Sequence, residues 1–78
     1  MIKVRLFGLL RLDSGIRELS VDASCLREVY EALEKHSASL SAKRLEGCVA
    51  LVNGKPCGRK TLLRDGDELM LLAPVAGG

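Results

Sequence analysis

The segment Ile2-Lys3-Val4-Arg5-Leu6-Phe7 opens the chain with apolar and basic side chains in alternation. Because successive side chains of a strand point to opposite faces of a sheet, this period of two predicts a strand whose first, third and fifth residues enter a core. Phe7 falls on the opposite face, so that face is not wholly polar. Near the other end of the chain, Asp67–Leu72 is a second apolar segment. We expect these two strands to pair in parallel at the centre of a mixed sheet.

The stretch after the first strand predicts a reversal of the chain and a second strand. Gly8–Leu12 indicates a bulge or a short helical turn, and Asp13-Ser14-Gly15 is typical of a chain reversal. In Ile16–Val21 the alternation returns more weakly. We therefore expect a second strand that forms a hairpin with the first.

A single main helix is predicted in the middle of the chain. Its apolar stripe, at the spacing i, i+3, i+4 and i+7, consists of Leu26, Val29, Tyr30 and Leu33. Ser24 is the expected N-cap, but Arg27 stands where a Glu or Gln would complete a capping box. The segment 37–46 has no clear period, so we expect a loop with at most one helical turn there.

The second half of the chain predicts three more strands. Cys48–Val52 is a continuous apolar run, which is typical of a central strand covered on both faces. Asn53-Gly54 favours a type I′ turn, and the proline in Lys55-Pro56-Cys57 places the return strand at an edge. Asp65-Gly66 predicts a turn before the last strand. The order β-β-α-β-β-β predicts an α+β fold of the β-grasp type, a mixed sheet crossed by one main helix.

Length and composition limit the function. With 78 residues, 47% of them hydrophobic, and a formal net charge of +2, the chain is expected to form one soluble domain. A domain this small buries only about 60 to 65% of its unfolded surface, which disfavours a free-standing enzyme with a deep pocket. No apolar run is long enough for a membrane span, and the charged start differs from a secretory signal. We therefore expect a cytoplasmic protein that does not bind membranes, and the two aromatic residues offer no stacking platform for nucleic acid.

The residues that usually carry chemistry give no site of their own. The spacing of the three cysteines, Cys25, Cys48 and Cys57, fits neither a zinc knuckle nor an iron-sulfur pattern, so no metal and no bound cofactor is expected. Cys25 lies where a helix start favours the thiolate, but ordinary packing is the preferred interpretation. His36 has no evident triad partner. Gly54–Thr61 lacks the spacing of a phosphate loop, which argues against ATP binding by this chain.

The chain ends in Ala73-Pro74-Val75-Ala76-Gly77-Gly78, and its last two residues have no Cβ. Extended, this segment reaches roughly 20 Å, enough to enter a partner's active site that excludes side chains. A frayed end without a role is the alternative. We interpret residues 1–78 as a single domain with 73–78 as a flexible functional tail.

These features together resemble the MoaD/ThiS family of ubiquitin-like sulfur carriers, across essentially the whole chain. The matching segments are Ile2–Phe7, Val49–Gly54, Leu63–Leu69 and Ala73–Gly78. The ending looks most like the molybdopterin synthase small subunits of this family, although Ala73 stands where they usually carry a proline.

The resemblance implies that a MoeB-like E1 enzyme uses ATP to adenylate the carboxylate of Gly78. A sulfur donor, such as a cysteine desulfurase or a rhodanese, then converts it to a thiocarboxylate. In the molybdopterin branch, a MoaE-like large subunit receives the tail, which is recognised through Pro74, Val75, Ala76 and Gly77. The isolated chain is then a sulfur-donating subunit and not an enzyme. Phe7 is expected in the partner interface because it joins an apolar sheet face that a single helix leaves exposed.

Three other functions remain open. A ThiS-like carrier for thiamine thiazole synthesis has the same fold and the same ending. A ubiquitin-like protein modifier would be joined through Gly78 to a lysine. A structural β-grasp interaction module would not need its tail.

Overall fold

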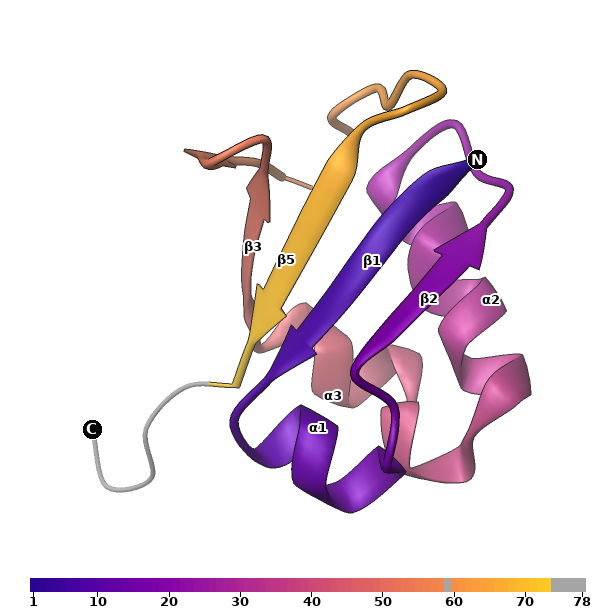
Figure 1. Ribbon diagram of the computed structural model, residues 1–78, viewed down its shortest axis with the longest axis vertical. Coiled ribbons are helices and arrows are strands. Elements are labelled where there is room, and N and C mark those ends of the chain that lie inside the picture. Colours follow the sequence, from indigo (N-terminus) through magenta and orange to yellow (C-terminus); the bar gives the residue numbers. More distant parts are fainter. Residues whose placement is uncertain (59, 74–78) are drawn as a thin grey trace.

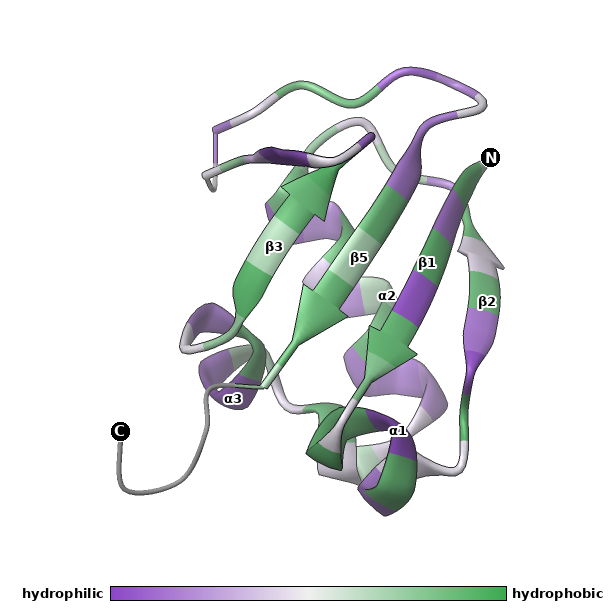
Figure 2. Ribbon diagram, turned by 60° about the vertical axis from the view of Figure 1, so that its left-hand side comes forward, coloured by the Kyte–Doolittle hydropathy of each residue, from purple (hydrophilic) through white to green (hydrophobic). Residues whose placement is uncertain are grey.

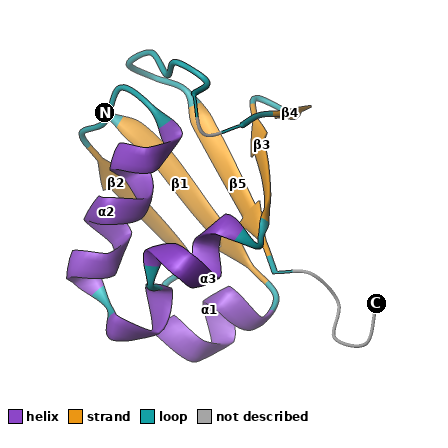
Figure 3. Ribbon diagram, turned by 180° about the vertical axis from the view of Figure 1, so that it is seen from behind, coloured by secondary structure: helices purple, strands orange, loops and turns teal. Residues whose placement is uncertain are grey.

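A computed structural model describes residues 1–58 and 60–73 of the chain. A five-stranded sheet has its helices on one face, and its other face is open (Figures 1 and 3). The elements in chain order are β1 (Ile2–Phe7), α1 (Leu9–Ser14), β2 (Glu18–Val21), α2 (Leu26–His36), a 3₁₀ turn (Ala38–Leu40), α3 (Ala42–Glu46), β3 (Val49–Val52), β4 (Lys55–Pro56) and β5 (Glu68–Leu72).

The sheet has the strand order β2-β1-β5-β3-β4. Its central pair is parallel, with Val4 opposite Leu69 and Leu6 opposite Leu71. The antiparallel strands β2 and β3 flank this pair. The predicted central parallel pairing, the hairpin partner of β1 and the α+β β-grasp fold are all confirmed.

The core lies between the sheet and the helices. The first, third and fifth residues of β1 are buried, as the alternation predicts. All four residues of the predicted helix stripe are buried as well, so α2 packs its apolar side against the sheet. Full burial of one such aliphatic side chain contributes about 1.5–3 kcal/mol, which makes this packing the main source of stability.

The start of α2 differs from its predicted cap by one residue. Cys25, and not Ser24, occupies the N-cap position, with an extended backbone. Glu28 then stands three residues later and accepts hydrogen bonds of 2.7 Å from both the backbone N–H and the hydroxyl of Ser24. These bonds lower the pKa of the Glu28 carboxyl. A carboxylate therefore does stabilise the start of this helix. The sequence did not predict it, because the residue three positions after Ser24 is Arg27, whereas the residue three positions after Cys25 is Glu28.

Two segments are more helical than predicted. Residues 37–46 contain the 3₁₀ turn and α3 instead of a loop, and Leu40 and Leu45 anchor them in the core. Of the two alternatives predicted for Gly8–Leu12, a bulge or a short helical turn, the helical one is confirmed, and α1 extends it to Ser14, between Gly8 (φ 62°) and Gly15 (φ 73°). Helices of five and six residues are too short to show a clear hydrophobic period.

An ion pair joins these two short helices. The Nη2 atom of Arg44 in α3 lies 2.6 Å from a carboxylate oxygen of Asp13 in α1. The Nη1 atom of the same guanidinium donates to the backbone carbonyl of Ser39, at 3.0 Å. Arg44 thus connects the three short helical segments at the end of the sheet where β1 and β5 finish (Figure 1).

The prediction that Cys48–Val52 forms a central, doubly covered strand was wrong. β5 is the central strand, and β3 has only the two-residue β4 on its outer side. Ala50 is buried, but Val49 is 51% exposed. Because the helices cover one face only, every second residue of β3 points toward the open face. The type I′ turn at Asn53 (φ 50°) and Gly54 (φ 85°) and the edge position of Pro56 are confirmed.

A polar network joins that turn to the start of β5. The side-chain amide of Asn53 donates to Asp67 at 3.1 Å and accepts from the backbone N–H of Glu68 at 3.1 Å. The other carboxylate oxygen of Asp67 accepts from the backbone N–H of Arg64 at 2.8 Å. The N–H of Arg64 and then the amide of Asn53 lower the pKa of the Asp67 carboxyl.

We predict that Asp67→Asn makes stability less dependent on acid. In the folded protein Asp67 holds its charge to a lower pH than in the unfolded chain. Its stabilisation is therefore complete above the unfolded pKa of about 3.9 and is lost as the pH falls through the lower folded pKa. Urea denaturation at several pH values measures this as a wild-type advantage that shrinks in acid.

Asp22→Asn is the matched control, because Asp22 is exposed and, among the described residues, its side chain has no hydrogen-bond or ion-pair partner. An advantage over Asp67→Asn that is the same at neutral pH and well below pH 4 would contradict the role assigned to the ionised carboxylate.

Candidate functional site

The end of the central strand is where the predicted tail begins. Leu72 is the last residue of β5, and its register partners are Phe7 on one side and Val49 on the other. Ala73 follows it and packs, half-buried, against the core, so this residue belongs to the folded body and not to the tail. The tail residues Pro74, Val75, Ala76, Gly77 and Gly78 lie outside the described residues. The predicted tail is therefore attached at the end of the middle strand of the sheet.

The open sheet face carries an apolar patch around this attachment point. Apolar residues follow β3 and β5 and recur at the end of β1 (Figure 2). One row of the patch crosses three strands, because Phe7, Leu72 and Val49 are consecutive register partners. A second row contains Met70 beside Leu51. We call these residues the open-face patch: Phe7, Val49, Leu51, Met70 and Leu72.

The exposure of the patch is intermediate, as expected of a surface that a partner covers. Phe7, Leu51, Met70 and Leu72 are half-buried, whereas Val49 is exposed. Their neighbours Leu69, Leu71 and Ala50 point to the opposite face and are buried in the core. The structure thus places Phe7 on the predicted side of the sheet, away from the helices. Contiguous apolar surface of this kind is typical of protein-binding sites.

Charged residues border the patch along β1 and β2. The Nε atom of Arg5 lies 3.4 Å from a carboxylate oxygen of Glu18, and both side chains are about half exposed. Lys3 is the register partner of Glu68 on one side and of Ser20 on the other. The open face is therefore apolar where β5 ends and polar where β5 begins.

The thiols of Cys48 and Cys57 lie away from this surface and pack against the core. Cys48 donates to the carbonyl of Arg44 at 3.4 Å, and Cys57 donates to that of Ala50 at 3.6 Å. Burial raises the pKa of both thiols. Cys25 is half-buried at the start of α2 and is also free. In the structure these cysteines are packing residues.

Within residues 1–58 and 60–73, no group of three or more His, Cys, Asp or Glu side chains is arranged to hold a metal ion. His36 is exposed at the end of α2. No described helix is both long and apolar enough to cross a membrane. What the described geometry offers is a surface for recognition at the open-face patch.

One feature beside the patch was not predicted from the sequence. Arg5, Arg11 and Arg17 line a common depression next to Phe7. These residues come from β1, α1 and the segment before β2, so the way these elements fold together places them at one depression. Only the regular occurrence of arginine in the first 17 residues hinted at it.

Comparisons with known proteins agree with this geometry. The small archaeal modifier protein 1 of Methanosarcina acetivorans is 30% identical, with a TM-score of 0.86, and the match covers 99% of this chain and 95% of that one. A chain in the complex of subunits 1 and 2 of the molybdopterin-converting factor from Helicobacter pylori is 29% identical, with a TM-score of 0.70 and coverages of 99% and 97%. The HVO 2177 protein of Haloferax volcanii is 28% identical, with a TM-score of 0.78 and coverages of 99% and 85%.

No curated protein matches the chain in sequence. The model of the ThiS family, however, matches residues 4–78, which include all the helices, the strands from the third residue of β1 onward and the terminal Gly-Gly. The chain therefore belongs to the ThiS family of ubiquitin-like sulfur carriers.

Proposed function

We propose that this chain carries sulfur as a thiocarboxylate on Gly78 and donates it to a biosynthetic partner. The single observation that carries the proposal is the family match, which extends through the C-terminal Gly-Gly. The anchoring of β5 between β1 and β3 supports it, because a partner that covers the open-face patch then lies beside the root of the tail. Small carriers of this family are generally not catalysts.

The chemistry explains why an activating enzyme is needed. A carboxylate is a poor electrophile, so an oxygen of the Gly78 carboxylate first attacks the α-phosphorus of ATP and pyrophosphate leaves. The terminal sulfur of a persulfide on a cysteine desulfurase or a rhodanese then adds to the acyl carbon and AMP leaves, which gives an acyl disulfide. A second thiol attacks the donor's cysteine sulfur in this acyl disulfide, which releases the thiocarboxylate and leaves a disulfide on the donor side. Exclusion of water protects the acyl-adenylate from hydrolysis. ATP is consumed by the E1-like enzyme, and this chain binds no cofactor of its own.

The proposed end use is molybdopterin synthesis, in which a large synthase subunit receives the tail. The 29% identity to a chain of the Helicobacter pylori molybdopterin-converting factor complex supports this branch. In that role Pro74, Val75, Ala76 and Gly77 are recognised in the partner's channel and Phe7 lies in the interface. A cytoplasmic location fits this role, because the activating step consumes ATP there.

A second candidate function is that of a protein modifier joined through Gly78 to lysines. The 30% identity to small archaeal modifier protein 1 favours it. A ThiS-like carrier for thiamine thiazole is the third. Conjugates that survive a denaturing gel distinguish the modifier, and loss of one or the other cofactor after gene deletion distinguishes the two biosynthetic carriers.

We predict that the protein purified from its own host includes a form in which one terminal oxygen is replaced by sulfur. Intact-mass spectrometry measures it, and a C-terminal fragment spectrum assigns it to Gly78. Removal of Gly77-Gly78 is expected to abolish this form without lowering the melting temperature, since neither residue has a side chain to pack. A truncated variant that still accepted sulfur would exclude the proposal.

We predict that the cysteines are dispensable for sulfur loading. The variant Cys25→Ser/Cys48→Ala/Cys57→Ala should still form the thiocarboxylate, because the sulfur is bound to the terminal carbonyl carbon. Loss of packing at the half-buried positions is expected to cost about 1 kcal/mol each. Loading is measured with purified activating enzyme and sulfide. A folded triple variant that is adenylated but accepts no sulfur would indicate a cysteine relay.

We predict that Phe7→Asp weakens binding to the enzyme that receives the tail. A charge in the middle of an apolar interface loses the packing of the ring and desolvates the carboxylate, at a cost of about 2 kcal/mol or more. Calorimetric titration with the large synthase subunit of the same organism measures the affinity.

Leu62→Asp is the matched control, because Leu62 is 79% exposed and pairs with Cys25 at the start of α2, away from the open-face patch. It introduces the same charge and should bind as the wild type does. If the two variants bound the partner equally well, Phe7 would not belong to the interface.

A further inference from the structure

A cationic depression lies next to the open-face patch. It has a volume of about 370 Å³ and is lined by Arg5, Leu6, Phe7, Arg11, Arg17 and Glu18. β1, α1 and the approach to β2 each contribute one arginine. The depression shares Phe7 with the patch, and Phe7 is the register partner of Leu72 at the end of β5. The depression therefore borders the patch at Phe7, on the β1 side of Leu72.

The positive charge of this depression is not neutralised within the described residues. Glu18 pairs with Arg5 at 3.4 Å. Arg11 and Arg17 are exposed, and neither guanidinium has an ion-pair partner in the described part of the chain. Three guanidinium groups against one carboxylate leave an excess of two positive charges, as large as the formal net charge of the whole chain.

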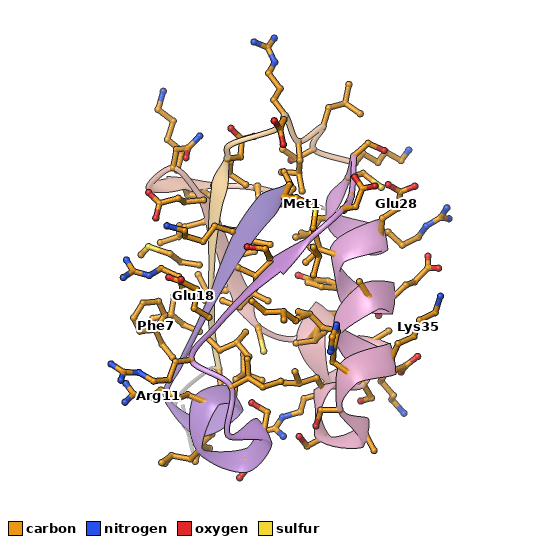
Figure 4. All side chains as sticks on the ribbon, turned by 45° about the vertical axis from the view of Figure 1, so that its right-hand side comes forward. Met1, Phe7, Arg11, Glu18, Glu28 and Lys35 are labelled. Carbon is orange, nitrogen blue, oxygen red and sulfur yellow. The ribbon has the colours of Figure 1, made fainter. Side chains whose placement is uncertain are left out.

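The opposite charge is concentrated elsewhere on the molecule. A second depression on α2 is lined by Asp22, Glu28, Glu31, Ala32, Lys35 and His36, so carboxylates outnumber the lysine there. Figure 4 shows Phe7 and Arg11 on one side of the molecule and Glu28 and Lys35 on the other. The folded chain therefore has a cationic side at the open-face patch and a more acidic side at α2. Such a separation orients an approaching charged partner.

We infer that this depression binds a segment rich in Asp and Glu side chains on the protein that docks on the open-face patch. The inference rests on the proposed function for the identity of that protein and on charge complementarity for its chemistry. A guanidinium group binds a carboxylate through two parallel hydrogen bonds, and Arg11 and Arg17 have this capacity free. Carboxylates placed here are held beside Phe7 and Leu72.

A protein segment fits this site better than a nucleic acid does. Two unpaired guanidinium groups are few for a phosphate backbone, and Glu18 at the rim repels one. Phe7 is the only aromatic side chain at the site, so there is no series of rings on which bases stack. Phe7 instead offers an apolar contact next to the charges, as a peptide with mixed side chains requires.

The expected effect is mainly on the rate and orientation of docking. Complementary charges at the rim of an interface accelerate association and fix the register, and most of the affinity comes from buried apolar contacts. Under this division, the open-face patch holds the partner, whereas Arg11 and Arg17 align it so that the tail enters the correct channel.

The first experiment needs no natural partner. The ¹⁵N-labelled full chain is titrated with a synthetic peptide of Asp, Glu and Gly, and its Asn, Gln and Gly counterpart is the neutral control. We expect shifts at Phe7, Arg11, Arg17 and Glu18 with the acidic peptide only, and their loss in Arg11→Gln/Arg17→Gln. The matched variant Lys35→Gln/Lys43→Gln removes two exposed cations of the helical side and should show the same peptide-induced shifts as the wild type.

Three results would overturn the inference. These are shifts spread evenly over all basic residues, equal shifts with the neutral peptide, and stronger shifts with a single-stranded oligonucleotide than with the acidic peptide. Unchanged signals elsewhere in the spectrum show that the variants are folded.

The second experiment uses the E1-like adenylating enzyme of the same organism as the probe. Arg11→Gln/Arg17→Gln should associate about tenfold more slowly at low ionic strength, with the difference disappearing in high salt. Phe7→Asp should instead dissociate faster at every salt concentration. An association rate that the arginine variant leaves unchanged at low salt would contradict the inference. Absence of a thiocarboxylate in the wild type would contradict the proposed function alone, because the peptide titration does not depend on it.

Discussion

The parallel pairing of β1 with β5 is the constraint on which the rest of the structure depends. It joins the first and last strands of the chain, and Val4, Leu6, Leu69 and Leu71 of this pair are almost completely buried. Backbone hydrogen bonds from Lys3 to Asp67 and from Gly66 to Met1, each 3.0 Å, extend the contact beyond the strands. The two strands bury these apolar side chains by pairing with each other. The chain between β1 and β5 must therefore lead back to the same sheet.

A consequence of this pairing is that the attachment of the tail is rigid. Leu72 ends a strand that has neighbours on both sides, and Ala73 still packs against the core. In the proposed function a thiocarboxylate is delivered into another protein's active site, so a fixed root allows docking of the body to determine where the chain end goes. The preorganised root also reduces the entropy that the complex must lose.

The small size of the domain leaves one face of the sheet uncovered. Its helices cover only one face of the sheet, which leaves Phe7, Val49, Leu51, Met70 and Leu72 on the other face. A free-standing protein would place polar residues there. Here the apolar patch is the part of the surface that a partner would bury, and the neighbouring arginines are the part that would orient this partner. Under the proposed function, the chain combines recognition and presentation, and its partners carry out the catalysis.

The sequence by itself determined the elements whose pattern is local and repeated. The alternation in β1, the stripe of α2 and the turns at Asn53-Gly54 and Asp65-Gly66 each predict one structure because each has a distinct period or backbone requirement. The parallel pairing of the first and last apolar strands could also be predicted, from the order of the elements along the chain. The family could be identified for the same reason, because its motifs are short continuous segments.

Only the tertiary structure decided the features that depend on neighbours distant in sequence. The helices α1 and α3 are too short for a period and depend on burial of Leu10 and Leu45 and on the ion pair between Asp13 and Arg44. The apolar run of β3 does not reveal which strand is central, because an apolar face looks the same whether a helix or a partner covers it. The meeting of Arg5, Arg11 and Arg17 depends on how β1, α1 and β2 fold together. Spacing along the chain does not encode that proximity, because packing across the sheet creates it.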